Sequence, residues 1–108
     1  MKFTNRRKLE ERFHQQMLNV YRRAKDECGY TANRFHQMVE EQGGLQTAKA
    51  LLASKRIPDG FAQLYMLGRL DISMENLVLQ EPWANLFTDT ELAVARRRLG
   101  GRVLERQA

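Results

Sequence analysis

Few side chains in this 108-residue sequence have the types and spacing that catalysis or metal binding requires. Glu11 and His14 have the i, i+3 spacing of carboxylate-bridged di-iron bundles. Those sites need a second copy of the motif, and Asn33 stands at the matching place before His36. Cys28 falls on the apolar face of the first predicted helix, where a free cysteine is usually a small core residue. We therefore predict no enzyme, no catalytic residue, no metal site and no cofactor.

The glycine pair Gly43–Gly44 separates two predicted helices between Ala32 and Ala53. A helix-turn-helix would have this spacing, but its second helix would present a single cation, Lys49, to DNA. The pair is not part of a P-loop either, because no Lys-Ser/Thr follows it. We favour a helical hairpin in which the glycines end the first helix.

Two further groups are interpreted as structural. Arg69 and Asp71 form a charged turn after Gly68, which is more typical of an ion pair than of a binding site. The aromatic residues Tyr65 and Trp83 are interpreted as core residues rather than as the walls of a ligand pocket.

The chemistry that the sequence favours is binding of phosphate groups by the two ends of the chain. Lys and Arg number 18 against 13 Asp and Glu, a net charge of +5. Residues 1–25 hold eight Lys and Arg against two Glu, and residues 96–108 hold five Arg against one Glu. Residues 26–95 hold five basic and ten acidic residues. Any contact with nucleic acid is therefore expected at the ends.

Polar residues also follow one line on the first predicted helix. At about 100° per residue, this line lies opposite the apolar face and runs about 21 Å from Lys8 to Arg22. Its members are Lys8, Arg12, Gln15, Asn19 and Arg22, whose side chains can donate to phosphate oxygens. The predicted nucleic-acid-binding residues of both ends are Arg6, Arg7, Lys8, Arg12, Arg22, Arg23, Arg96, Arg97 and Arg98.

The elements that must position these residues are helices. An apolar residue recurs every three or four positions in each interval between glycines and prolines, and β-branched residues are few. The clearest apolar face consists of Leu9, Phe13, Met17, Val20, Tyr21, Ala24 and Cys28. We predict an all-α fold, a compact bundle of five to seven mostly short helices with a long amphipathic first helix.

Capping residues mark several helix boundaries. Thr31 is predicted to be the N-cap of the second helix, and Ser73 that of a later one. Thr88 and Glu91 have the spacing of a capping box. Gly29 suits the left-handed residue that ends a helix.

Length and composition predict one domain, since 108 residues are too few for two ordinary ones. We divide it into a basic N-terminal helix 4–28, an acidic helical body 31–99 and a basic tail 100–108. One cysteine excludes an internal disulfide framework, and no apolar run reaches the roughly 18 residues of a membrane helix. No apolar segment of a signal peptide follows the first residues. We expect a cytoplasmic protein of bacterial type that has no membrane partner.

Two motifs carry a resemblance to a known family. They are Gly68-Arg69-Leu70-Asp71 and Leu86-Phe87-Thr88-x-x-Glu91-Leu92, within a similarity that covers about residues 13–99. The sequence resembles an uncharacterised family of small all-helical bacterial proteins. Its members occur alone or beside nuclease-like and defence genes, and this gene context points to a role with nucleic acid. The resemblance implies no catalytic residue, and it does not reach the charged ends 1–12 and 100–108.

Two functions follow as predictions. The first is a non-catalytic helical binding module that contacts the phosphate backbone of DNA or RNA non-specifically through its basic ends. The alternative is a protein-protein interaction or regulatory module, for example a homodimer, with no nucleic-acid role. The acidic composition of residues 26–95 and the apolar residues of several short helices motivate this alternative.

Overall fold

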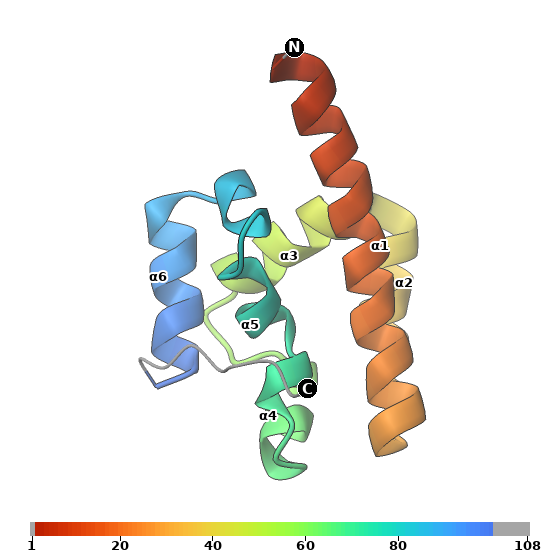
Figure 1. Cartoon of the computed structure of the whole chain (residues 1–108). Coiled ribbons are helices and arrows are strands. Elements are labelled where there is room, and N and C mark those ends of the chain that lie inside the picture. The colour runs from red at the N-terminus through yellow and green to blue at the C-terminus, as the bar shows by residue number, and fades with distance from the viewer. Residues whose placement is uncertain (1, 101–108) are drawn as a thin grey trace.

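The computed structural model of the chain describes residues 2–100, with side chains from residue 5 onward. These residues form six α-helices, two short 3-10 helices and no strand, which confirms the predicted all-α bundle. Residues 101–108 of the predicted basic tail lie outside the described residues. The elements are α1 (Lys2–Cys28), α2 (Asn33–Gln42), α3 (Gly44–Ala53), α4 (Asp59–Met66), η1 (Leu70–Ile72), α5 (Met74–Val78), η2 (Trp83–Leu86) and α6 (Asp89–Arg98) (Figure 1).

The main hydrophobic core lies between α1, α2, α3, α5, η2 and α6. Phe13 of α1 is fully buried and packs edge-on against Phe87, with ring centroids 5.5 Å apart. The ring of Trp83 also packs against Phe13, with ring centroids 6.0 Å apart, as expected of a core aromatic residue. The buried members of this main cluster are Phe13, Met17, Val39, Leu45, Ala48, Leu52, Met74, Val78, Leu86, Phe87 and Ala95.

A second, smaller cluster lies where the end of α1 meets α4 and η1. Its buried residues are Ala24, Leu64 and Ile72, and Cys28 packs against them. The apolar face predicted for the first helix is confirmed, but it serves two separate clusters rather than one. Cys28 has the packing role that its position predicts.

Most predicted caps are confirmed. The Ser73 hydroxyl accepts from the Asn76 N–H at the start of α5, and Thr88 and Glu91 form a reciprocal capping box at α6. Gly29 ends α1 with a φ of +69°. The Thr31 prediction is wrong, because α2 begins at Asn33 and its N-cap position is taken by Ala32, which supplies no side-chain oxygen.

The turn between α2 and α3 is a single residue, Gly43, with a φ of +88°. Beyond it, α3 runs across the direction of α2 instead of back along it (Figure 1), so the hairpin prediction is wrong. The reason is that a one-residue link leaves no chain for a reversal. Leu45 and Leu52 of α3 still pack with Val39 of α2 in the main cluster.

The start of α3 is held against the middle of α1. A Cβ added at Gly44 would lie 2.7 Å from the His14 Cα, so the close approach of the two backbones requires glycine here. The Gly44 N–H donates to His14 Nδ1 at 2.9 Å, which satisfies one of the free N–H groups at a helix start. His14 therefore positions α3, and its Nδ1 lone pair is not available to a metal ion.

Candidate functional site

The outward face of α1 is the largest group of predicted binding residues that the structure leaves exposed. Lys8, Arg12, Gln15 and Arg22 are exposed, and Asn19 between them is partly buried and accepts a hydrogen bond from Arg22. The N-terminal turns of α1 extend beyond the other helices (Figure 1). Arg7, which is also exposed, lies beside this line. We call Lys8, Arg12, Gln15 and Arg22, together with Arg7, the α1 polar face.

Among the described residues, the cations of the α1 polar face form no ion pair, whereas two other predicted cations of α1 do. Arg6 Nε lies 3.1 Å from Glu10 Oε2, one helical turn away, although both side chains are largely exposed. Arg23 Nε lies 2.7 Å from Glu27 Oε2, and its guanidinium also lies 4.0 Å from Asp71. The positive charge of Arg23 is thus already balanced within the protein, so we leave it out of the proposed surface, and its contact with phosphate stays a prediction.

Arg23 belongs to a four-residue ion-pair cluster that joins the end of α1 to η1. Arg69 donates to both oxygens of Asp71, at 3.0 and 3.1 Å, and to Glu27 at 2.8 Å. The structural pair predicted for Arg69 and Asp71 is therefore confirmed. Hydrogen bonds from Arg23 and then from Arg69 lower the pKa of Glu27 to about 2, so this carboxylate stays ionised in mild acid.

Arg98, also predicted to bind phosphate, is a structural residue instead. Its side chain is 6% exposed, and its guanidinium donates to Glu75 at 2.9 Å. It also donates at 3.0 Å to the backbone carbonyls of Leu51 and Ser54 at the end of α3. Arg98 therefore ties α6 to α5 and α3. Because its side chain is buried and three of its hydrogen bonds go to groups within the protein, we leave Arg98 out of the proposed phosphate-binding set.

Arg96 and Arg97 remain exposed at the end of α6. That end and the start of α1 lie at opposite sides of the molecule (Figure 1). The two basic ends thus do not form one continuous surface over the described residues. The side chain of Arg98 is buried whereas Arg96 and Arg97 are exposed, because Arg98 lies one helical turn after the buried Ala95 and so on the same face of α6. This spacing is visible in the sequence.

The α2–α3 unit has no basic face that would suit DNA. Lys49, the single cation of α3, donates to Glu91 of α6 at 2.8 Å and lies over the ring of Phe87. Burial opposes ionisation of Glu91, but the hydrogen bonds from Lys49 and Thr88 outweigh it and lower its pKa. Lys49 thus contributes to the packing of α3 on α6.

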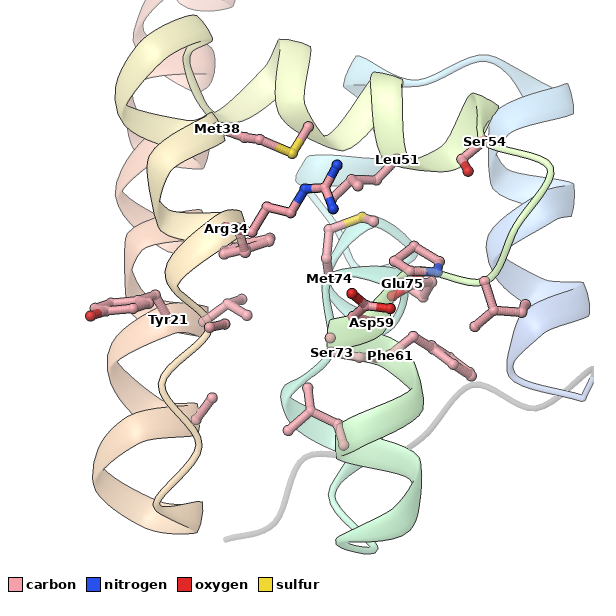
Figure 2. Close-up of a pocket in the computed structure, with 18 of the residues that line it drawn as sticks. Tyr21, Arg34, Met38, Leu51, Ser54, Asp59, Phe61, Ser73, Met74 and Glu75 are labelled. Atoms are coloured by element: carbon pink, nitrogen blue, oxygen red, sulfur yellow. The ribbon is translucent and has the colours of Figure 1, made fainter.

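A cavity of about 390 Å³ lies between α1 and α2 on one side and α4 and α5 on the other, with α3 above it (Figure 2). No pattern in the sequence predicts this cavity. Its walls are mainly apolar and include Val20, Phe35, Met38, Leu51, Phe61, Leu64 and Met74. Four charged residues line it as well. They are Arg34 of α2, Asp59 of α4 and Glu75 of α5, which Figure 2 shows, and Arg56 from the segment between α3 and α4.

The charged groups of the cavity differ in what they already contact. Glu75 is 2% exposed and bound to Arg98, although burial raises the pKa of its carboxyl group. Arg34 and Asp59 are exposed, and neither forms an ion pair with a described residue. Burial and then the charge of Asp59 raise the pKa of Tyr30, another residue of the wall.

Over the described part of the chain, no group of three or more His, Cys, Asp or Glu is placed to hold a metal ion. None of the helices there is both long and apolar enough to cross a membrane. Comparison with known proteins gives no match to a protein-family model, to a curated protein or to a solved structure. The resemblance over residues 13–99 therefore stays a prediction.

Proposed function

We propose that this chain is a non-catalytic module that contacts the phosphate backbone of nucleic acid, without reading its sequence, through the α1 polar face. The observation that supports the proposal is that Arg7, Lys8, Arg12 and Arg22 are exposed and form no ion pair with a described residue. Gln15 adds a neutral donor on the same face.

The spacing of these residues suits a regular polyanion. A straight helix keeps Lys8 and Arg22 about 21 Å apart along its axis, which corresponds to roughly six base pairs of duplex DNA. Contacts of Arg, Lys and Gln with phosphate oxygens fix a protein on the duplex but carry no information about bases. Non-specific binding is therefore the expected mode.

The test is a salt titration of binding to a fluorescent DNA duplex, followed by fluorescence anisotropy. Four phosphate contacts predict that log K falls with log[salt] with a slope of about −3.6. Replacing Lys8 and Arg12 by Gln should reduce the magnitude of the slope by about 1.8. The matched variant in which Arg96 and Arg97 become Gln should leave the slope unchanged.

Absence of binding at low salt, or a slope near zero, would overturn the proposal. An equal loss in the two variants would contradict the assignment to α1 and would implicate both ends. The same titration with an RNA duplex measures whether the contact distinguishes the two nucleic acids.

A second candidate function, self-association, is favoured by a different observation. Tyr65, Met66 and Leu67 at the end of α4 are 64%, 79% and 45% exposed, so Tyr65 is not the core residue that was predicted. Three consecutive large apolar side chains at one tip would be covered if two copies packed tip to tip.

Sedimentation measures this directly. We expect a dimer for the chain and a monomer for Met66→Glu, with Gln63→Glu on the same helix as the control. A monomer in all three samples would exclude self-association through this tip.

A further inference from the structure

The cavity interrupts the hydrophobic core. Phe35, Leu51 and Met74 of its wall belong to or pack on the main cluster, and Ala24 and Leu64 belong to the smaller one. Small domains usually have one contiguous core with few voids. Here the space between the two clusters remains open, and the apolar atoms that line it lack packing partners on one side.

The size and lining of the cavity suit a small molecule. Ligand sites have volumes of about 300–1,000 Å³, mostly apolar walls and a few polar groups that orient the ligand. At about 390 Å³ the cavity falls at the lower end of this range. A partly apolar ligand would restore the packing that the divided core lacks.

The positive charge of Arg34 favours a ligand that carries an anionic group. The Arg34 side chain extends from α2 toward the cavity, which Met38, Leu51 and Met74 also line (Figure 2). A ligand that fills the cavity would remove water from this cation, which is costly unless the ligand supplies an acceptor for it. A carboxylate is the best acceptor, because it can take two parallel hydrogen bonds from a guanidinium.

The other charges of the lining determine the orientation. Glu75 is already neutralised by Arg98, and Arg56 adds a second exposed cation. Asp59 faces the cavity from the first turn of α4 and would repel an anion placed near it. An anionic head group is therefore expected at Arg34, with its apolar body directed toward Phe61 and Leu64.

We propose that this cavity is a binding site for a small monocarboxylate with an apolar body, held by Arg34 at the head group and by the walls of α1, α4 and α5 along the body. The site is separate from the α1 polar face, so it does not depend on the proposed contact with nucleic acid. No covalent step is involved.

Calorimetric titration with three ligands of the same chain length, octanoate, octanol and octylamine, tests the proposal. Octanoate is expected to bind about tenfold tighter than octanol, because its carboxylate is an anionic acceptor that can take two hydrogen bonds from the guanidinium, whereas the octanol hydroxyl is a single neutral acceptor. Octylamine is expected to bind weakest. Equal affinities, or tightest binding of octylamine, would overturn the assignment of an anion to this cavity.

Two variants locate the binding. Arg34→Gln should remove the advantage of octanoate and leave octanol binding unchanged, whereas Arg96→Gln, with the same change of charge outside the cavity, should alter neither. An unchanged octanoate-to-octanol ratio in Arg34→Gln would overturn the role of Arg34.

Ala50 lines the cavity from α3 and is exposed, so Ala50→Trp can fill the space with little disturbance of the buried core. This variant should lose all three ligands while keeping its helical circular dichroism. Retained binding in a folded Ala50→Trp would place the ligands elsewhere, for example on the exposed tip of α4, and would overturn the proposal.

Discussion

The start of α1 and the end of α6 both carry clustered cations, yet these cations have different surroundings. Lys8 and Arg12 face solvent and form no ion pair with a described residue. Arg98 is buried and uses its guanidinium on Glu75 and on two backbone carbonyls. An exposed cation can exchange water for a phosphate, while a buried one has already exchanged water for acceptors within the protein. Positive charge therefore indicates a binding surface only where no carboxylate of the same chain lies opposite.

The largest effect expected from this difference concerns Arg98. Arg98→Gln should lower the free energy of unfolding by about 3–5 kcal/mol, because Glu75 is left buried without its counter-charge. Urea denaturation measures the loss, and Arg97→Gln, one residue away and exposed, should stay within about 0.5 kcal/mol of the original chain.

The loss in Arg98→Gln should also depend on pH. Burial raises the pKa of Glu75 in the folded state. The cost of ionising this carboxyl is absent below the unfolded-state pKa and grows as pH rises above it. The difference in the free energy of unfolding between the original chain and Arg98→Gln should therefore be larger at pH 7 than at pH 4. Equal stability of Arg98→Gln and Arg97→Gln would contradict the structural role of Arg98.

A smaller effect is expected where α1 is anchored. Gly44→Ala should cost about 1–3 kcal/mol, because its Cβ would overlap the backbone of His14 and force the helices apart. Thermal unfolding measures the loss. Gly60→Ala is the control, since a Cβ there would meet no atom within 4 Å. If both variants melted alike, the close contact of α1 with α3 would be disproved.

Two arginines of α1 sharpen the comparison within one helix. Arg12→Gln should weaken binding of duplex DNA and leave stability within about 0.5 kcal/mol, because Arg12 is exposed and forms no ion pair with a described residue. Arg23→Gln should leave DNA binding unchanged and lower stability by less than about 1 kcal/mol, since partly exposed ion pairs contribute little. Anisotropy and urea denaturation separate the two outcomes, and the reverse pattern would contradict the distinction between available and paired cations.

The smallest effect expected is the pH dependence of the ion-pair cluster. The pKa of Glu27 is about 2 in the folded chain, below its ordinary value of 4.5. Its contribution to stability is therefore complete above pH 4.5 and is lost as pH falls toward 2. The difference in urea midpoint between the original chain and Glu27→Gln should be constant from pH 5 to 7 and should decrease toward zero below pH 4.5. A gap that does not change with pH would show that Glu27 acts through packing rather than through its charge.

Local features of the fold were predictable because each depends on a few neighbouring residues. Ser73 caps α5 and Thr88 pairs with Glu91 because a side-chain oxygen reaches an N–H three residues away. The prediction that Thr31 caps α2 is wrong because tertiary packing decides this helix start. Ala32 is buried, lines the cavity and takes the N-cap position.

The candidate site was less predictable. The carboxylate partner of Arg98, Glu75, is 23 positions away in the chain. Arg23 pairs with Glu27, one helical turn away, but its second partner, Asp71, is 48 positions away. The cavity combines residues from α1 to α5, and no local pattern reports whether facing helices fill the space between them.

The sequence by itself determined the helical class, the apolar face of α1 and most of the caps, since these follow from periodicity and from hydrogen bonds between near neighbours. Tertiary structure alone decided which distant carboxylates pair with Arg69 and Arg98, why Gly44 must be glycine and where the core is left open. These properties depend on how closely distant helices approach one another, and that distance is set by the packing of the whole chain.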